Sequence, residues 1–135
     1  MIKLYTDAST KNNPGPSGVG IVISAENRYE QLAIPLDKVM SNHEAEFEAL
    51  IKGLDYLIDH QLTVETLMVY TDSKLVASAI KKNYVKKDIF KTYLVLITEK
   101  LHHFPLFFVQ WIPQSQNKGA DQLARQALQK ILLKN

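Results

Sequence analysis

The amino-acid sequence predicts an α/β protein in which helices flank a mixed sheet of five strands. Three observations support this fold class: short runs rich in β-branched and aromatic residues, longer segments with apolar residues at helical spacing, and the order in which the two alternate. The predicted order is β-β-β-α-β-α-α-β-α. A helix between two strands requires a crossover, so part of the sheet is expected to be parallel.

The first three strands are predicted at residues 2–8, 19–23 and 29–36. Residues 12–18, rich in Asn, Pro and Gly, form a turn cluster between the first two strands. Residues 26–28 are a hairpin connection between the second and the third. Three strands joined by such short loops predict an antiparallel meander.

A helix is predicted to begin at Ser41 or Asn42, either of which can cap it, and to run to about His60. Trp111 is expected in the core, because it lies in an apolar strand. The later elements are assigned by the same patterns: a strand at 67–71, helices at 73–82 and 88–102, a strand at 104–112, and a last helix from Asn117. No long repeat or linker interrupts residues 1–135, so one domain is expected.

The composition excludes several classes of site. The chain has no cysteine, which excludes disulfides, thiolate metal sites and a cysteine nucleophile, and is compatible with a cytoplasmic location. We expect no signal peptide and no membrane span, because no apolar run has the required length. The net charge of +2 permits a polyanionic partner without identifying one. No obligate protein partner is indicated, and a monomer is expected.

Two predicted strands end on an aspartate, in the sequences Tyr-Thr-Asp7 and Tyr-Thr-Asp72. Ligands of open α/β sheets bind outside the carboxyl ends of the strands, so Asp7 and Asp72 are candidates for one shared site. The alternative is that each aspartate is a local turn or cap residue, a position that Asp favours.

Two helices add further carboxylates. Glu46 lies off the exposed stripe that includes Glu44 and Glu48, at the edge of the buried face, so it is predicted to point toward the sheet. Burial without a partner is costly for a carboxylate, which therefore requires a cation. Asp121 borders the apolar stripe of the last helix, although the helix dipole alone favours an acid there.

Carboxylates that meet at one point repel each other unless a cation lies between them. Mg²⁺ prefers oxygen ligands, and two such ions can stabilise the attacking and leaving oxygens of a phosphoryl transfer. The sequence contains no phosphate-binding loop, dinucleotide fingerprint, zinc-protease motif, nucleophile elbow or EF-hand loop. A divalent-metal site for phosphate chemistry is therefore the predicted function.

Four segments, in order, resemble the motifs of type 1 ribonuclease H: Tyr5 to Pro16, Ser41 to Leu50, Tyr70 to Ser73, and Trp111 to Ala124. The resemblance implies a ribonuclease H-like fold and an endonuclease that cuts the RNA strand of RNA–DNA hybrids, leaving a 3′-hydroxyl and a 5′-phosphate. It also implies two Mg²⁺ or Mn²⁺ ions, held by the catalytic carboxylates Asp7, Glu46, Asp72 and Asp121.

The predicted substrate contacts are polar residues of these motifs and a lysine cluster: Asn13, Ser41, Asn42, His43, Ser73, Asn117, Lys81, Lys82, Lys86 and Lys87. The lysines can form a phosphate track, or an ordinary solvated surface. Three features depart from the family pattern. His43 replaces a usual asparagine, the loop 113–118 lacks the histidine that many members carry, and the stretch 73–104 is too short for a basic protrusion.

Two other functions stay open at this point. The missing loop histidine favours a module of the same fold that binds nucleic acid without cleaving it, whereas the intact acidic set argues against this. A related metal nuclease that acts on double-stranded RNA or branched DNA is the second alternative, because groove contacts and surface shape decide the substrate.

Overall fold

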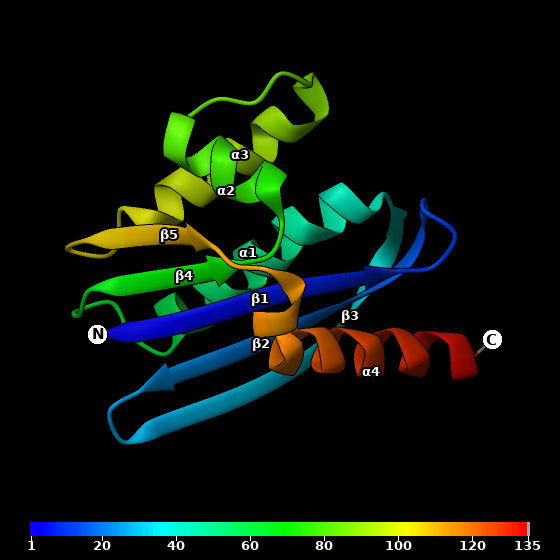
Figure 1. The fold of residues 1–135 in the computed structure, drawn as a ribbon, viewed down its shortest axis with the longest axis horizontal. Helices are drawn as coiled ribbons and strands as arrows, with labels where there is room; N and C mark the ends of the chain where they lie inside the picture. The colour runs from blue at the N-terminus through cyan, green and yellow to red at the C-terminus, as the bar shows by residue number, and fades with distance from the viewer. Residues whose placement is uncertain (135) are drawn as a thin grey trace.

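The computed structural model describes residues 1–134 and contains one sheet with the strand order β3-β2-β1-β4-β5 (Figure 1). The strands are β1 (Ile2–Thr10), β2 (Gly15–Ala25), β3 (Arg28–Met40), β4 (Leu67–Thr71) and β5 (Phe107–Trp111). The helices are α1 (Asn42–Asp59), α2 (Lys74–Lys82), α3 (Asp88–Leu101) and α4 (Lys118–Lys134), with a 3₁₀ turn at Gln114–Gln116. The predicted fold class and element order are confirmed.

The sheet is mixed, as predicted. β1, β2 and β3 form the antiparallel meander, whereas β4 pairs in parallel with both β1 and β5. The last pair between β1 and β4 joins Thr6 to Thr71. Asp7 therefore lies inside β1, which continues to Thr10, but at the level where β4 ends.

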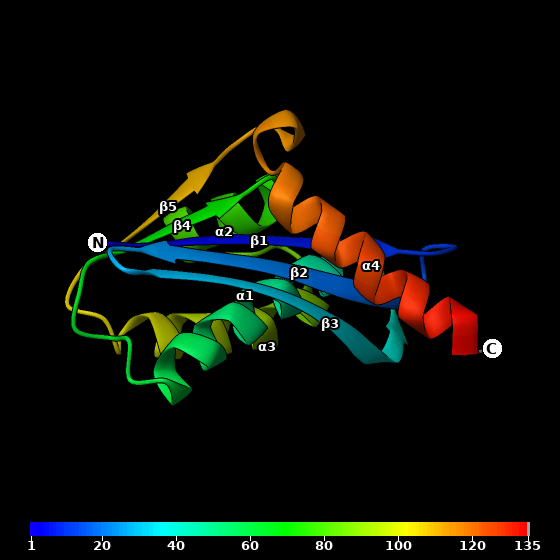
Figure 2. The same ribbon diagram turned by 90° about the horizontal axis from the view of Figure 1, so that it is seen from below.

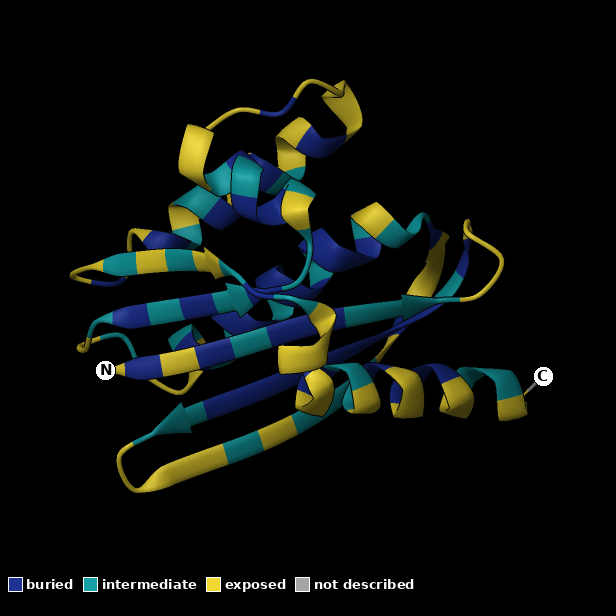
Figure 3. Ribbon diagram, viewed as in Figure 1, coloured by how far each residue is buried: buried dark blue, intermediate teal, exposed yellow. Residues whose placement is uncertain are grey.

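Helices cover both faces of the sheet. α1 and α3 lie on one face and α4 on the other (Figure 2). Buried residues concentrate within the central strands and on the inner side of the helices (Figure 3). α1 buries Phe47, Leu50, Leu54 and Leu57 completely, and this burial of a whole helical stripe holds α1 against the sheet.

A capping box formed by Ser41 and Glu44 marks the start of α1. The Ser41 hydroxyl accepts a hydrogen bond from the Glu44 backbone amide, and the Glu44 carboxylate accepts one from the Ser41 amide, at 3.1 and 3.2 Å. This capping box satisfies two amides that would otherwise lack partners at the helix end. It fixes the start of α1, and with it the position of Glu46 one turn further on.

α4 packs unusually close to β2 because glycines face it. A Cβ atom on Gly20 would lie 1.9 Å from the Ala120 carbonyl oxygen, and one on Gly18 would lie 2.4 Å from that of Ala124. No side chain fits in this space, so the two glycines permit backbone contact between strand and helix. The first turns of α4, including Asp121, are thereby held against the sheet.

Several boundaries differ from the prediction. β2 and β3 are longer, because their hairpin extends to Gly15 and Met40, and β5 is shorter, because Phe104 is buried in the connection before it. Trp111 is not a core residue: β5 is an edge strand and leaves the indole partly exposed. No helix within residues 1–134 has the length and hydropathy needed to cross a membrane.

Candidate active site

Three carboxylates meet where β1 and β4 separate. One oxygen atom each of Asp7, Glu46 and Asp72 lies within 4.8 Å of the other two. Asp7 and Glu46 are 4% and 6% exposed, and Asp72 is half-buried. The parallel pairing of Thr6 with Thr71 brings the two aspartates side by side, and α1 supplies the glutamate. We call Asp7, Glu46 and Asp72 the carboxylate cluster.

Neutral donors hold the cluster in place. The Ala8 amide donates to Glu46 Oε1 at 3.2 Å, and Asn117 Nδ2 donates to Asp72 Oδ2 at 3.2 Å. The Trp111 indole donates to the Asp72 carbonyl at 3.1 Å. Glu46 Oε2 is buried and accepts no hydrogen bond from residues 1–134. A buried acceptor without a donor is costly, which indicates that a further group belongs beside it.

The cluster is electrostatically unbalanced. Burial, with the negative charge of Asp72, raises the pKa of Asp7 to about 7. Burial, with the charge of Asp7, raises the pKa of Glu46 well above its usual value, and burial also raises that of Asp72. These oxygen ligands, their mutual repulsion and the orphaned Glu46 oxygen fit a hard divalent cation.

Asp121 lies outside the group of three. Its carboxylate pairs with Arg125 one turn further along α4, at 3.2 Å, and is partly exposed. Its charge nevertheless raises the pKa of both Asp7 and Asp72, so it is close enough to affect them. Asp121 is therefore at the rim of the cluster.

A groove of about 500 Å³ runs beside the cluster, between the β1–β2 turn, the start of α1 and α4. Asn13, Asn42, Asp121 and Arg125 are among the residues that line it. The Asn13 side-chain oxygen accepts a hydrogen bond from the Asn42 amide at 2.8 Å, which ties the turn to the start of α1. The groove thus connects the rim carboxylate with two predicted substrate contacts.

Comparison with known proteins agrees with this geometry. A family model described as reverse transcriptase-like matches residues 5–127. The structure of LC11-RNase H1 in complex with an RNA/DNA hybrid superposes with a TM-score of 0.87 and 30% identity, covering 98% of this chain and 99% of that one. The chain belongs to the ribonuclease H family.

Two relatives in sequence support the assignment of this chain to the ribonuclease H family. EbsB of Enterococcus faecalis, named provisionally as a hydrolase, is 46% identical over 131 residues, which are 97% of this chain and 96% of EbsB. Ribonuclease HI of Synechocystis is 27% identical over 150 residues, covering 95% of this chain and 88% of that protein. The protein is accordingly an enzyme of the ribonuclease H class, a hydrolase.

The remaining predicted contacts of this ribonuclease H occupy different surroundings. Ser73 caps α2, because its hydroxyl accepts from the Val76 amide at 3.1 Å. His43 is exposed, with its ring edge against Phe90. The four lysines are all exposed around the end of α2 and the connection to α3: Lys81, Lys82, Lys86 and Lys87.

Asn117 is not on the groove surface. It is 2% exposed, and its side-chain amide donates both to the Thr6 carbonyl, at 2.9 Å, and to Asp72. The substrate contact expected at Asn117 stays a prediction, since the side chain also lines a pocket beside the start of α4. Its hydrogen bonds to Thr6 and Asp72 give it a second role, which is to position Asp72.

Three supporting residues were missed from the sequence. Arg125 could have been found, since it follows Asp121 by one helical turn. Trp111 gave no local signal, because Asp72 lies 39 positions away. Tyr93 gave none either: its hydroxyl donates to Glu44 Oε2 at 3.2 Å and braces the capping box of α1 from α3.

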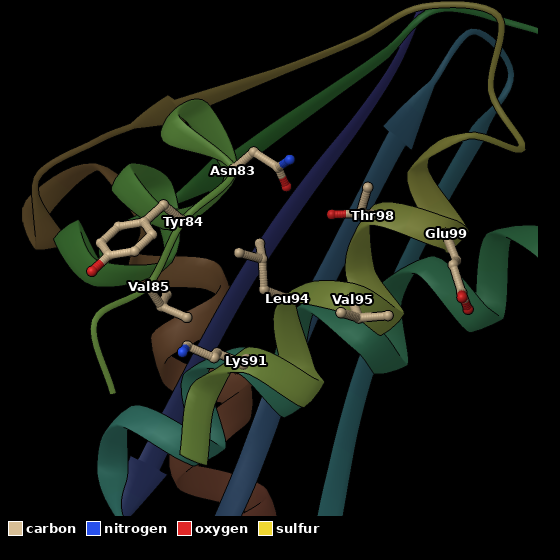
Figure 4. A pocket seen from close by; sticks show the side chains of 8 residues that line it. All are labelled: Asn83, Tyr84, Val85, Lys91, Leu94, Val95, Thr98 and Glu99. Atoms are coloured by element: carbon tan, nitrogen blue, oxygen red, sulfur yellow. The ribbon is translucent and has the colours of Figure 1, made fainter. Parts of the chain in front are cut away.

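A separate cavity of about 380 Å³ lies between the α2–α3 connection and α3 (Figure 4). Its walls are mainly apolar, from Val85, Leu94 and Val95, with Lys91 and Glu99 at its edges. No member of the carboxylate cluster lines it. It therefore lacks the groups that the chemistry of the cluster requires.

Proposed function

We propose that this protein is an endonuclease that hydrolyses the RNA strand of RNA–DNA hybrids at the carboxylate cluster. The observation that carries the proposal is the meeting of buried Asp7 and Glu46 with half-buried Asp72, while no lysine or arginine of residues 1–134 forms an ion pair with them. The relatives named ribonuclease H, and the related LC11-RNase H1 bound to an RNA/DNA hybrid, support the choice of substrate.

The cluster would hold two Mg²⁺ or Mn²⁺ ions, with Asp121 contributing from the rim. When bound, such ions polarise the scissile phosphate and make water a stronger nucleophile, which yields a 3′-hydroxyl and a 5′-phosphate. Asp7, Glu46 and Asp72 supply the anionic oxygens. Asn117 and Trp111 orient Asp72 through its carboxylate and its carbonyl.

The groove beside the cluster would receive the hybrid. Asn13 and Asn42 line it and offer amide groups to sugar hydroxyls and base edges, which is how proteins recognise A-form-like duplexes through the shallow groove. His43 would contact the duplex from the exposed start of α1. The exposed lysines around Lys82 and Lys86 would contact phosphates without reading sequence.

The loop that precedes α4 contributes no titrating histidine. Its exposed side chains, from Gln114, Ser115 and Gln116, are neutral amides and a hydroxyl. Proton transfer would therefore pass through water rather than an imidazole.

The test compares Asp72→Asn with Glu48→Gln, a change on α1 outside the cluster. Asp72→Asn should lower cleavage of a labelled RNA–DNA hybrid at least about 100-fold, because it removes an anionic ligand. Glu48→Gln should cleave as the parent does, and circular dichroism should show both variants folded.

Substrate and metal are varied in the same assay. Hybrid, double-stranded RNA and branched DNA are compared with Mg²⁺, with Mn²⁺ and with chelator. If double-stranded RNA or branched DNA were cleaved faster than the hybrid, that nucleic acid would be the preferred substrate instead. Hybrid binding with no metal-dependent cleavage would identify a non-cleaving module instead.

A further inference from the structure

The sheet face that carries α4 is covered over only part of its area. α4 contacts β2 from the level of Val22 to that of Gly18, since a Cβ on Gly119 would lie 3.4 Å from the Val22 side chain. Toward the end of β1 at which the chain begins, no helix within residues 1–134 crosses this face (Figure 1). Figure 2 shows α4 on one side of the sheet, with α1 and α3 on the other. The part of the face beside the first turn of α4, toward the start of β1, is thus not covered by a helix.

A slot of about 330 Å³ lies on this open face. Val22 and Ser24 of β2 form its floor, and Tyr5 and Tyr29 rise on either side, because the register places Tyr5 opposite Val22 and Tyr29 opposite Ser24. Lys3 stands opposite Ser24 on β1. We call these five residues the tyrosine slot.

The chemistry of the tyrosine slot suits a nucleotide. Tyr29 is 62% exposed, and its phenol oxygen accepts a hydrogen bond from Gln31. Two aromatic walls favour a planar ring between them, and the Lys3 ammonium favours a phosphate. None of the residues that line the slot is acidic. Its volume lies at the lower end of the range for small-ligand sites, about 300–1,000 Å³.

The position of the slot connects it to the carboxylate cluster. Tyr5 precedes Asp7 by two residues on the same face of β1, a separation of about 6.6 Å. Tyr70 stands in the same relation to Asp72, and its ring stacks on that of Tyr5 with centroids 4.7 Å apart. A nucleic-acid strand that passes the cluster and continues onto the sheet would meet the slot next.

We propose that the tyrosine slot binds one unpaired nucleotide of a single strand that continues from the carboxylate cluster. The base lies between Tyr5 and Tyr29, and its phosphate lies at Lys3. Only an unpaired base can enter, because a duplex keeps its bases stacked inside. A hybrid with a single-stranded overhang is therefore bound more tightly than a blunt one. The inference rests on the proposed function for the path of the strand.

The first test measures binding of a fluorescent eight-residue oligothymidylate in Mg²⁺ by anisotropy. This probe has no 2′-hydroxyl and is not a ribonuclease substrate, so binding and cleavage can fail separately. Tyr29→Ala should weaken binding about 5- to 100-fold through lost stacking. Tyr29→Phe keeps the ring and should bind within about 2-fold of the parent.

Phe108→Ala is the matched control. Phe108 is 47% exposed on the same face, but lies on β5, beyond the stacked Tyr5 and Tyr70 rings and outside the slot. Binding should not change in this variant. The proposal is overturned if the parent does not bind the probe, if Tyr29→Ala binds like the parent, or if Phe108→Ala loses as much affinity.

Two further measurements locate the nucleotide. Lys3→Gln should reduce the slope of log affinity against log salt by about 0.7, the value for one phosphate contact on a single strand. Light-induced crosslinking of a 5-iodouracil-substituted probe should label the peptides that contain Tyr5 or Tyr29. An unchanged slope, or labelling only of other peptides such as the one with Tyr84, contradicts the slot. Hybrid cleavage, measured in parallel, judges the proposed function independently.

Discussion

Two groups of carboxylates in this protein have opposite surroundings. At the surface, Asp55 pairs with Lys100, Asp88 with Lys91, and Asp121 with Arg125. In the carboxylate cluster, no lysine or arginine of residues 1–134 forms an ion pair with Asp7, Glu46 or Asp72. Within residues 1–134, lysine and arginine side chains thus pair with hydrated carboxylates and form no ion pair with the three carboxylates of the cluster.

The difference appears directly in the pKa values. Lys91 lowers the pKa of Asp88, through a hydrogen bond and its charge, whereas burial raises the pKa of Asp7 to about 7. The surface pairs contribute little to stability, because water screens them. The cluster opposes folding once it is ionised, and a cation from outside relieves that cost. Functional sites commonly destabilise a protein that lacks its ligand, because function rather than stability selects their residues.

Asp7→Asn is expected to have the largest effect on activity and on metal-free stability. Removing one buried anionic ligand should lower hybrid cleavage at least about 100-fold. The same change should raise the melting temperature at pH 8 in chelator, because it removes a buried charge. Asp88→Asn, which removes a surface carboxylate, should alter neither property measurably. A melting temperature that fell in metal-free Asp7→Asn would contradict the view that the cluster is strained.

The pH dependence of stability also distinguishes the carboxylate cluster from the paired surface carboxylates. The folded-state pKa of Asp7 is raised from 3.8 to about 7, so its protonated form stabilises the folded protein below about pH 4. This contribution is lost as pH rises through 7. In chelator, the melting temperature should fall between pH 5 and pH 8 by at least about 3 °C.

Asp7→Asn and Mg²⁺ should each make this dependence shallower. The variant has no group to titrate at position 7, and Mg²⁺ binds the ionised carboxylates of the folded state. Calorimetry with and without chelator measures both effects. Equal pH dependence in the parent and the variant would show that Asp7 does not titrate in this range.

Gly20→Ala tests how far the rim carboxylate depends on close packing. The added Cβ would lie 1.9 Å from the Ala120 carbonyl oxygen, so α4 must move away from β2. We expect a loss of about 1–3 kcal/mol in the free energy of unfolding, and lower activity because Asp121 moves with the helix.

Gly119→Ala is the control for that change. Its Cβ would lie 3.4 Å from Val22, an ordinary contact for a methyl group, and alanine favours a helix. Its stability, measured by urea unfolding, should stay within about 1 kcal/mol of the parent. If Gly20→Ala were equally well tolerated, the contact between β2 and α4 would not position Asp121.

The smallest effect is expected from Arg125→Gln. The pair with Asp121 is exposed and screened, so its loss should change the Mg²⁺ concentration for half-maximal activity by less than about 5-fold. The direction should be toward tighter binding, because Asp121 becomes unpaired beside the cluster. A titration of activity with Mg²⁺ measures this shift, and a large weakening would assign Arg125 a role in the substrate groove.

The sequence by itself determined the elements and most of the acidic residues. The choice of Glu46 over Glu48 needed only the helical period, because apolar residues at helical spacing mark the buried face of α1 in each successive turn. Asp7 and Asp72 could be paired because each follows Tyr-Thr in an apolar strand, and parallel neighbours align such positions, although β1 continues past Asp7 to Thr10. These signals are local in the chain, or repeat along it.

Only the tertiary structure decided how these residues are supported. Asn117 donates a hydrogen bond to Thr6, which lies 111 positions earlier in the chain, and no local sequence pattern predicts that contact. The position of Asp121 depends on Gly18 and Gly20, which matter because a distant helix lies against them. Side chains that bridge distant segments, and spaces into which no side chain fits, arise only when the layers pack together. The chain alone therefore indicated which carboxylates to consider, and packing decided that three of them meet and the fourth stays at the rim.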